Sequence, residues 1–258
     1  MDMQKNWSVG NVFLKDAFSL SDEILNSLEN KKPQLPIQQS VFFDFAIRAH
    51  CCLKATYVLW QQFTEKTVFK FPIAIQLRVG VLDFITFLYL FKYRNNENEF
   101  RQEVDSLNQQ FYSWMSGHAE NYTEEEKSRF EVFLKSHFPL KYDGEGNKVK
   151  VKSHIASQMV EDAKRGELGE YVNTSYNIYR LLSQYEHYSE VSRKFMLRPT
   201  EVDLEEFMVA IDCILLLQYF SFQLLGVDEV LFKRYEALYH NYVSSYGDGQ
   251  IIETKGIT

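Results

Sequence analysis

The sequence predicts a mainly α protein: a multi-helix bundle with at most one small β-hairpin, near residues 140–152. Three observations predict it. Apolar residues recur at three-to-four spacing over long stretches, which is the period of a helix with one buried face. Glycine and proline are scarce, at 11 and 5 of 258 residues, which disfavours a turn-rich β-sandwich. Hydrophobic residues make up 45% of the chain, so a sizeable core is available.

The first helices are expected on either side of a proline-containing break. Ser21-Asp22-Glu23 is typical of a helix start, and it is followed by Ile24, Leu25 and Leu28 on one face. Pro33 and Pro36 then interrupt the chain. Apolar residues at helical spacing over 38–63 predict one long helix there.

Three helices are expected in the next part of the chain. Pro72 is well placed in the first turn of a helix that ends by Tyr93, before two asparagines. The pattern over 100–115 predicts a further helix, which ends around Gly117. Thr123 and the glutamates that follow it form a capping box, in which the hydroxyl and the third-following carboxylate satisfy free amides at a helix start.

The stretch 140–152 is the one that lacks a helical pattern. A turn at 143–147 is flanked by alternating lysines and valines, which is typical of a small hairpin or a surface loop. Its lysines could touch phosphates, but such a row is more often a solvated edge. Ser153 is a candidate cap for a short helix through Lys164, and the chain is interrupted again at 166–169.

The C-terminal part is predicted as three helices. The first is long and spans 171–195. The second starts at Thr200 or Asp203 and is closed by Gly226, and it is apolar on most sides. The last helix covers 227–246.

No flexible linker divides the chain, so we expect a single helical domain over 1–246 with a loose tail at 247–258. The N-terminus lacks the apolar core of a secretion signal. The two most apolar segments, 72–91 and 209–225, both contain charged or amide side chains, which is typical of central helices in a soluble bundle rather than of membrane spans. We therefore expect a cytoplasmic protein that does not associate with membranes. The net charge of −7 disfavours broad coating of nucleic acid or anionic lipid, but it leaves room for a local basic site.

The sequence offers little support for metal or cofactor chemistry. Its three cysteines, Cys51, Cys52 and Cys213, do not form a disulfide framework and are typical of small buried residues. No Glu-x-x-His pair of a di-iron bundle is present, and there is no phosphate loop, dinucleotide fingerprint or nucleophile elbow. We expect no metal and no cofactor.

Charged residues inside the two apolar segments are more informative. Arg78 and Asp83 interrupt the first segment, and Asp212 interrupts the second. Because ionised groups are seldom buried without partners, we expect all three to meet polar groups of other helices inside the bundle. Two interpretations stay open: a structural network of ion pairs, or a polar pocket in which Arg78 anchors an anion.

A second candidate cluster lies in the helix expected at 171–195. Ser183, Gln184 and His187 follow Arg180 by three, four and seven residues, so a continuous helix would place all four on one face. Arginine suits phosphate binding, and histidine suits proton transfer near neutral pH. The plainer alternative is an interhelical network with a satisfied histidine.

The pattern Tyr179-x-x-Leu182-Ser183-x-x-x-His187 resembles one found in a family of all-helical bacterial proteins of unassigned function. Members of that family also carry, in an earlier helix, an arginine followed by an acid one turn later. Arg78 and Asp83 resemble this pair, although they are five residues apart. More distantly, Arg180 and His187 with six residues between them resemble the HEPN superfamily of helical nucleotide- and RNA-associated domains. The resemblance implies an all-helical fold and, for catalytic members, a site in a dimer cleft.

Two classes of function remain. The first is a binding or interaction module with an internal polar pocket for an anionic ligand, built from a set of candidate residues: Arg78, Asp83, Arg180, Ser183, Gln184, His187 and Asp212. The second is a HEPN-like, metal-independent ribonuclease, in which Arg180 would stabilise phosphate charge and His187 would move protons. The candidate partners are thus an anionic small molecule or RNA, with a homodimer expected for the nuclease.

Overall fold

The computed structural model describes residues 3–29, 34–63, 69–118, 122–137, 154–186, 190–197 and 200–246. Within these ranges the chain is mainly helical and contains no strand, which confirms the predicted fold class. The hairpin expected near 140–152 and the tail at 247–258 lie outside the described residues.

The first half of the described chain contains five helices, whose bounds are α1 Met3–Glu29, α2 Ile37–Phe63, α3 Lys70–Phe91, α4 Glu97–His118 and α5 Glu124–His137. The second half contains α6 Ala156–Ala163, α7 Glu170–Leu182, the 3-10 turn η4 Ser183–Tyr185, α8 Glu190–Leu197, α9 Thr200–Leu224 and α10 Glu229–Tyr246.

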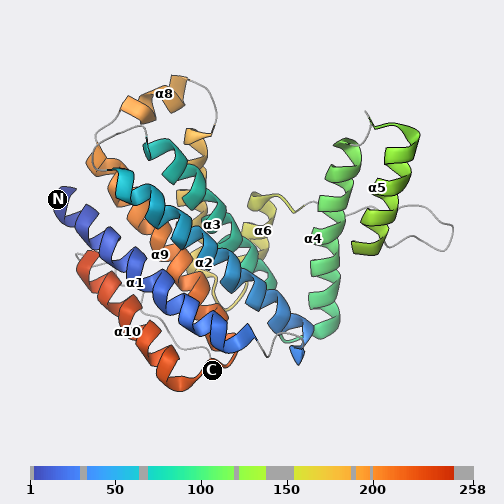
Figure 1. The fold of residues 1–258 in the computed structure, drawn as a ribbon, viewed down its shortest axis with the longest axis horizontal. Helices are drawn as coiled ribbons and strands as arrows, with labels where there is room; N and C mark the ends of the chain where they lie inside the picture. The colour runs from blue at the N-terminus through green and yellow to red at the C-terminus, as the bar shows by residue number, and fades with distance from the viewer. Residues whose placement is uncertain are drawn as a thin grey trace.

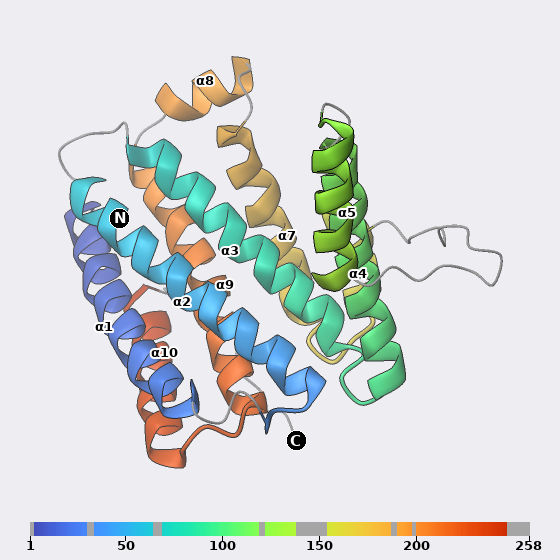
Figure 2. The same ribbon diagram turned by 45° about the vertical axis from the view of Figure 1, so that its right-hand side comes forward.

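Two layers of helices form the bundle. In Figures 1 and 2, α1, α2 and α3 lie side by side over a layer that contains α10, α9 and α7. Helix α9 occupies the centre, where it packs against α1, α2, α3, α7 and α10. Helix α3 packs against α2, α6, α7 and α9, so both α3 and α9 meet neighbours on several sides, which accounts for their apolar sequences.

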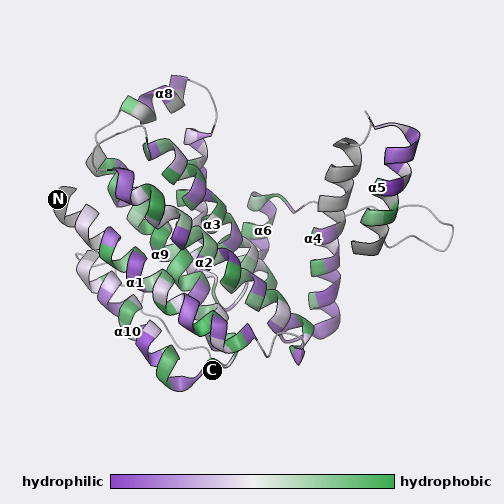
Figure 3. Cartoon of the chain, in the orientation of Figure 1, coloured by the Kyte–Doolittle hydropathy of each residue, from purple (hydrophilic) through white to green (hydrophobic). Residues whose placement is uncertain are grey.

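The hairpin of α4 and α5 projects from one side of this bundle (Figures 1 and 2). Its base is fixed by Phe100, which is fully buried against Phe42 with ring centroids 5.5 Å apart. Farther along, its described residues are mostly hydrophilic (Figure 3).

Several helix ends follow the predicted local chemistry. The capping box at α5 is present: the Thr123 amide donates to Glu126 at 2.9 Å, and the Glu126 amide donates to the Thr123 hydroxyl at 3.4 Å. Pro72 lies in the first turn of α3. Gly226 has a φ of +59°, a left-handed conformation that closes α9 at the predicted residue.

Two expected helix boundaries are wrong. The first helix begins at Met3 rather than near Ser21, and Ser21 is instead a fully buried residue inside α1. Its hydroxyl accepts a 2.6 Å hydrogen bond from Gln218, so a polar residue that is typical of a cap serves in an interhelical contact. The helix expected over 171–195 is not continuous, because α7 ends at Leu182 and continues only as the turn η4.

Candidate functional site

Arg78 lies in the middle of α3, and its guanidinium group faces the end of α7. Its Nε donates to the Ser183 hydroxyl at 2.9 Å, and its Nη2 donates to the Tyr179 hydroxyl at 3.1 Å. Its Nη1 lies 2.9 Å from a carboxylate oxygen of Glu186. All three guanidinium nitrogens therefore have a partner, and all three partners come from one short stretch of chain.

The end of α7 explains how these partners converge. Ser183 caps α7, and its hydroxyl donates to the Tyr179 carbonyl at 2.8 Å while it accepts from Arg78. The chain then tightens into a 3-10 turn, which carries Glu186 to the same guanidinium. Because the helix breaks here, the Glu186 carboxylate lies beside the Arg78 guanidinium, whereas a continuous helix would have carried the chain farther along its axis.

The Arg78 cluster, which consists of Arg78, Tyr179, Ser183 and Glu186, is open to solvent on one side. The Arg78 side chain is 20% exposed and the Glu186 side chain is 40% exposed. The guanidinium group also lies over the Tyr179 ring, 5.0 Å from its centroid. A cation with two hydroxyl neighbours and an exposed carboxylate partner is suited to exchange that carboxylate for another anion.

The remaining candidates on α7 lie differently. Arg180 is exposed, and its guanidinium group lies 5.9 Å from the centroid of the Tyr176 ring. The Gln184 side chain turns back and donates to the Arg180 carbonyl at 3.3 Å. His187 lies outside the described residues. Because α7 ends at Leu182, the single helical face expected for Arg180, Ser183, Gln184 and His187 does not form as one continuous α-helical stripe.

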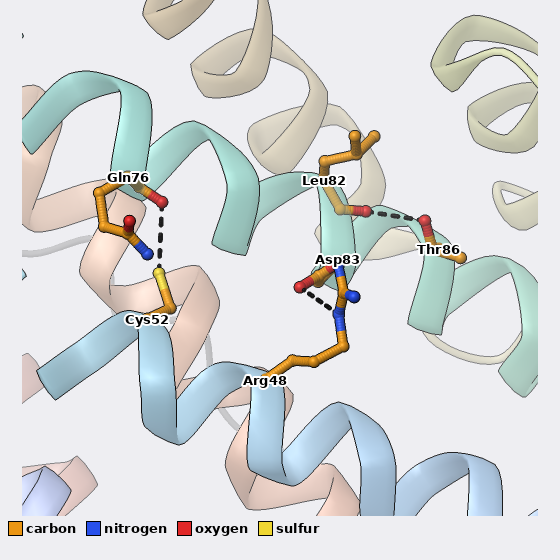
Figure 4. A network of polar contacts seen from close by, with 6 residues as sticks. All are labelled: Arg48, Cys52, Gln76, Leu82, Asp83 and Thr86. Carbon is orange, nitrogen blue, oxygen red and sulfur yellow. Dashed lines mark hydrogen bonds and ion pairs between the residues drawn. The ribbon is translucent and has the colours of Figure 1, made fainter. Parts of the chain in front are cut away.

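Asp83 belongs to a different contact from Arg78. It faces α2, where Arg48 donates to its carboxylate in two hydrogen bonds of 2.9 and 2.6 Å (Figure 4). Burial raises the pKa of the Asp83 carboxyl, although the Arg48 guanidinium opposes the shift. The prediction that Arg78 and Asp83 find partners on other helices is confirmed, but the two residues are held by different helices.

Asp212 lies in α9, near Tyr171 of α7 and Tyr239 of α10. Burial raises the pKa of its carboxyl to about 6, and the nearby Tyr239 hydroxyl only partly offsets this shift. None of its neighbours just named belongs to the Arg78 cluster. The structure therefore distributes the three charged residues of the apolar helices over three separate environments.

The sequence reasoning missed a buried ion pair at the same end of the bundle. Lys70, the first residue of α3, pairs with Asp203 in the first turns of α9, and the Tyr185 hydroxyl also donates to Asp203. The side chains of the pair are 4% and 0% exposed. A lysine and an aspartate near the starts of the two most apolar helices were the signal that could have found this contact.

A second missed cluster joins the base of α4 to the bundle. The Tyr89 hydroxyl of α3 donates to Glu103 of α4, and His154 Nε2 lies 3.8 Å from the same carboxylate. The His154 side chain is almost fully buried, and its ring lies 5.5 Å from the Tyr89 ring. Because they are separated by long stretches of sequence, these residues give no local pattern.

Within the described ranges, no group of three or more His, Cys, Asp or Glu side chains is arranged to hold a metal ion. Comparison with protein-family models, curated proteins and solved structures finds no match for this chain. The Arg78 cluster is the described site whose chemistry is best suited to a ligand, since it joins a partly exposed cation to two hydroxyl groups.

Proposed function

We propose that this protein is a helical binding module that takes an anionic ligand at the Arg78 cluster. The observation that carries the proposal is the Arg78–Glu186 contact: the cation is held in place by Ser183 and Tyr179, while its counter-charge comes from a carboxylate that is 40% exposed. Exposed ion pairs contribute little, roughly 0–1 kcal/mol, so an incoming anion displaces Glu186 at low cost.

The hydroxyl groups support the same function. An arginine that is fixed by neighbours loses less freedom when it binds a planar or tetrahedral anion than a mobile one does. The Ser183 hydroxyl lies beside the guanidinium and can rotate to donate to a bound oxygen. The ligand oxygen would then replace the Glu186 carboxylate, and Glu186 would move toward solvent.

Calorimetric titration with inorganic phosphate tests the proposal. Glu186→Gln removes the competing carboxylate, so it is expected to tighten phosphate binding roughly two- to five-fold. Arg78→Lys keeps the charge but loses the fixed fork of donors, so it is expected to weaken binding about tenfold.

Arg48→Lys is the matched control, because Arg48 also pairs with a carboxylate but lies between α2 and α3. It is expected to bind phosphate like the parent. A purely structural Arg78 network would give no phosphate binding in the parent, or binding that Glu186→Gln fails to strengthen; either result contradicts the proposal.

The metal-independent ribonuclease is the second candidate, and the exposed side chain of Arg180 favours it, since a catalytic arginine must reach the substrate. His187 would supply proton transfer. Cleavage of single-stranded RNA in the presence of a chelator, lost in both Arg180→Ala and His187→Ala and accompanied by a dimer on gel filtration, would support it. A parent protein that leaves RNA intact contradicts it.

A location in the cell goes with the proposed binding function. We propose that the protein works in the cytoplasm without associating with membranes; the burial of its two most apolar helices against their neighbours supports this.

A further inference from the structure

Aromatic and cationic side chains contact one another in a row beside the Arg78 cluster, in the order Arg78, Tyr179, Tyr176 and Arg180. The Tyr176 and Tyr179 rings are nearly parallel, with an interplanar angle of 15° and centroids 6.5 Å apart. Arg78 lies over the Tyr179 ring and Arg180 lies over the Tyr176 ring. These four residues, three from α7 and Arg78 from α3, form the α7 ladder, in which each ring contacts one cation and the other ring.

The ladder is partly open. Tyr176 and Tyr179 are both half-buried, and Arg180 is exposed. A centroid separation of 6.5 Å leaves part of each ring face uncovered by the other ring. The Arg180 group is 5.9 Å from the Tyr176 centroid, at the outer limit of a cation–π contact, so this contact is loose and exchangeable.

We propose that the anionic ligand of the Arg78 cluster also carries an aromatic ring, which stacks on Tyr176 under the Arg180 guanidinium. This inference rests on the proposed function and names its ligand class: a small molecule in which an aromatic ring bears an anionic group. The anion contacts Arg78 and Ser183. The attached ring stacks on Tyr176, where Arg180 adds a cation above it; the Tyr179 ring is already covered by Arg78.

Three probes separate the two parts of the ligand: inorganic phosphate, cyclohexyl phosphate and phenyl phosphate. In a mildly alkaline buffer both organic phosphates are dianions of nearly the same size, but only phenyl phosphate has an aromatic ring that can stack. Phenyl phosphate is expected to bind the parent protein about five- to tenfold more tightly than cyclohexyl phosphate, which is the range of one aromatic stacking contact.

Tyr176→Leu is expected to abolish this preference without weakening inorganic phosphate binding. Arg180→Gln, at an exposed position that folding tolerates, is expected to lower the preference about two- to threefold. Tyr93→Leu is the matched control, because the Tyr93 ring also lies 4.9 Å from a cation, Lys92, but in the turn that follows α3. It is expected to keep the preference.

The outcomes distinguish the two proposals. Equal binding of phenyl and cyclohexyl phosphate overturns the aromatic inference and leaves the anion site standing. A preference that survives in Tyr176→Leu also overturns the inference, because the ring then lies elsewhere. Failure of all three phosphates to bind the parent overturns the proposed function itself.

Discussion

Single residues decide how closely the central helices approach. Gly80 lies where α3 meets both α2 and α9, and a Cβ atom there would lie 2.6 Å from Ile214 and 2.7 Å from the Cys52 sulfur. No larger side chain fits without displacing these neighbours. Nearby, the Cys52 sulfur lies 3.3 Å from the Gln76 carbonyl, as an S–H donor (Figure 4). The glycine therefore sets the spacing of three helices, a role that its place in an apolar run does not reveal.

Asp212 makes the stability of the folded protein depend on pH. Its carboxyl has a pKa of about 6 in the folded protein, against an ordinary value of 3.8. Between these two values the folded state binds more protons than the unfolded state, so this residue makes stability fall as the pH rises from about 4 to about 7. A carboxyl pKa raised by burial from 3.8 to about 6 corresponds to about 3 kcal/mol of stability at neutral pH.

We therefore expect Asp212→Asn to be more stable than the parent at pH 7, by up to about 3 kcal/mol, and to match it near pH 4. Urea unfolding at several pH values measures this difference. Asp16→Asn, at an exposed position of α1, is the control and should follow the parent at each pH. A difference that grows as the pH falls would contradict the prediction.

Polar contacts join several helices near their ends, in addition to the apolar packing along their lengths. Lys70, Asp203 and Tyr185 join the starts of α3 and α9 to the turn that follows α7. The Arg78 cluster lies two turns further along α3 and holds the same end of α7. The position of the candidate site thus depends on a buried ion pair that does not itself face solvent.

This arrangement predicts a large effect of Asp203→Asn. The substitution removes the Asp203 carboxylate from its buried contact with the Lys70 ammonium, and breaking a buried pair by removing one charge costs about 3–5 kcal/mol. For a chain of this length, thermal unfolding should shift down by roughly 6–20 °C.

Replacing the whole group by apolar residues is the informative comparison. Lys70→Met, Asp203→Leu and Tyr185→Phe together remove every charge and hydroxyl of the group, so the loss should be much smaller than in Asp203→Asn alone. A triple variant as unstable as the single one would show that the pair contributes net stability of its own, which contradicts the expectation.

At the scale of the whole molecule, the protein is a two-layer bundle built around α9. Helices α3 and α9 are long and apolar enough to cross a membrane by length and composition alone. Within their most apolar windows, however, 67% and 78% of the residues are buried inside the bundle. The apolar side chains of α3 and α9 therefore pack mainly against other helices of the bundle.

We expect the full chain to remain in the supernatant after high-speed centrifugation of a lysate prepared without detergent. Most residues in the apolar windows of α3 and α9 are buried against other helices, so little of this apolar surface is left for lipid. The control is a second sample extracted with detergent, which should not increase recovery. Recovery only in the detergent extract would contradict both this prediction and the proposed location.

The start expected at Ser21 is wrong, but the sequence predicted the fold class, the extents of α2, α3, α9 and α10 to within a few residues, and the capping box of α5. These features depend on periodicity, on Pro72 and Gly226, and on short-range contacts such as the Thr123 box, all of which are encoded within a few residues. It also identified Arg78, Asp83 and Asp212 as charged groups that need partners, because an apolar run makes a charge conspicuous.

The partners of these charged groups depend on how the helices pack together. Ser183 and Glu186 reach Arg78 because α7 breaks at Leu182, and Asp83 turns to Arg48 because α2 packs on that side. The break is invisible to a pattern of apolar spacing, since residues on both sides keep that spacing. Partner choice depends on how the helices pack, and packing is set by contacts such as Gly80 against Ile214 that join residues far apart in the chain.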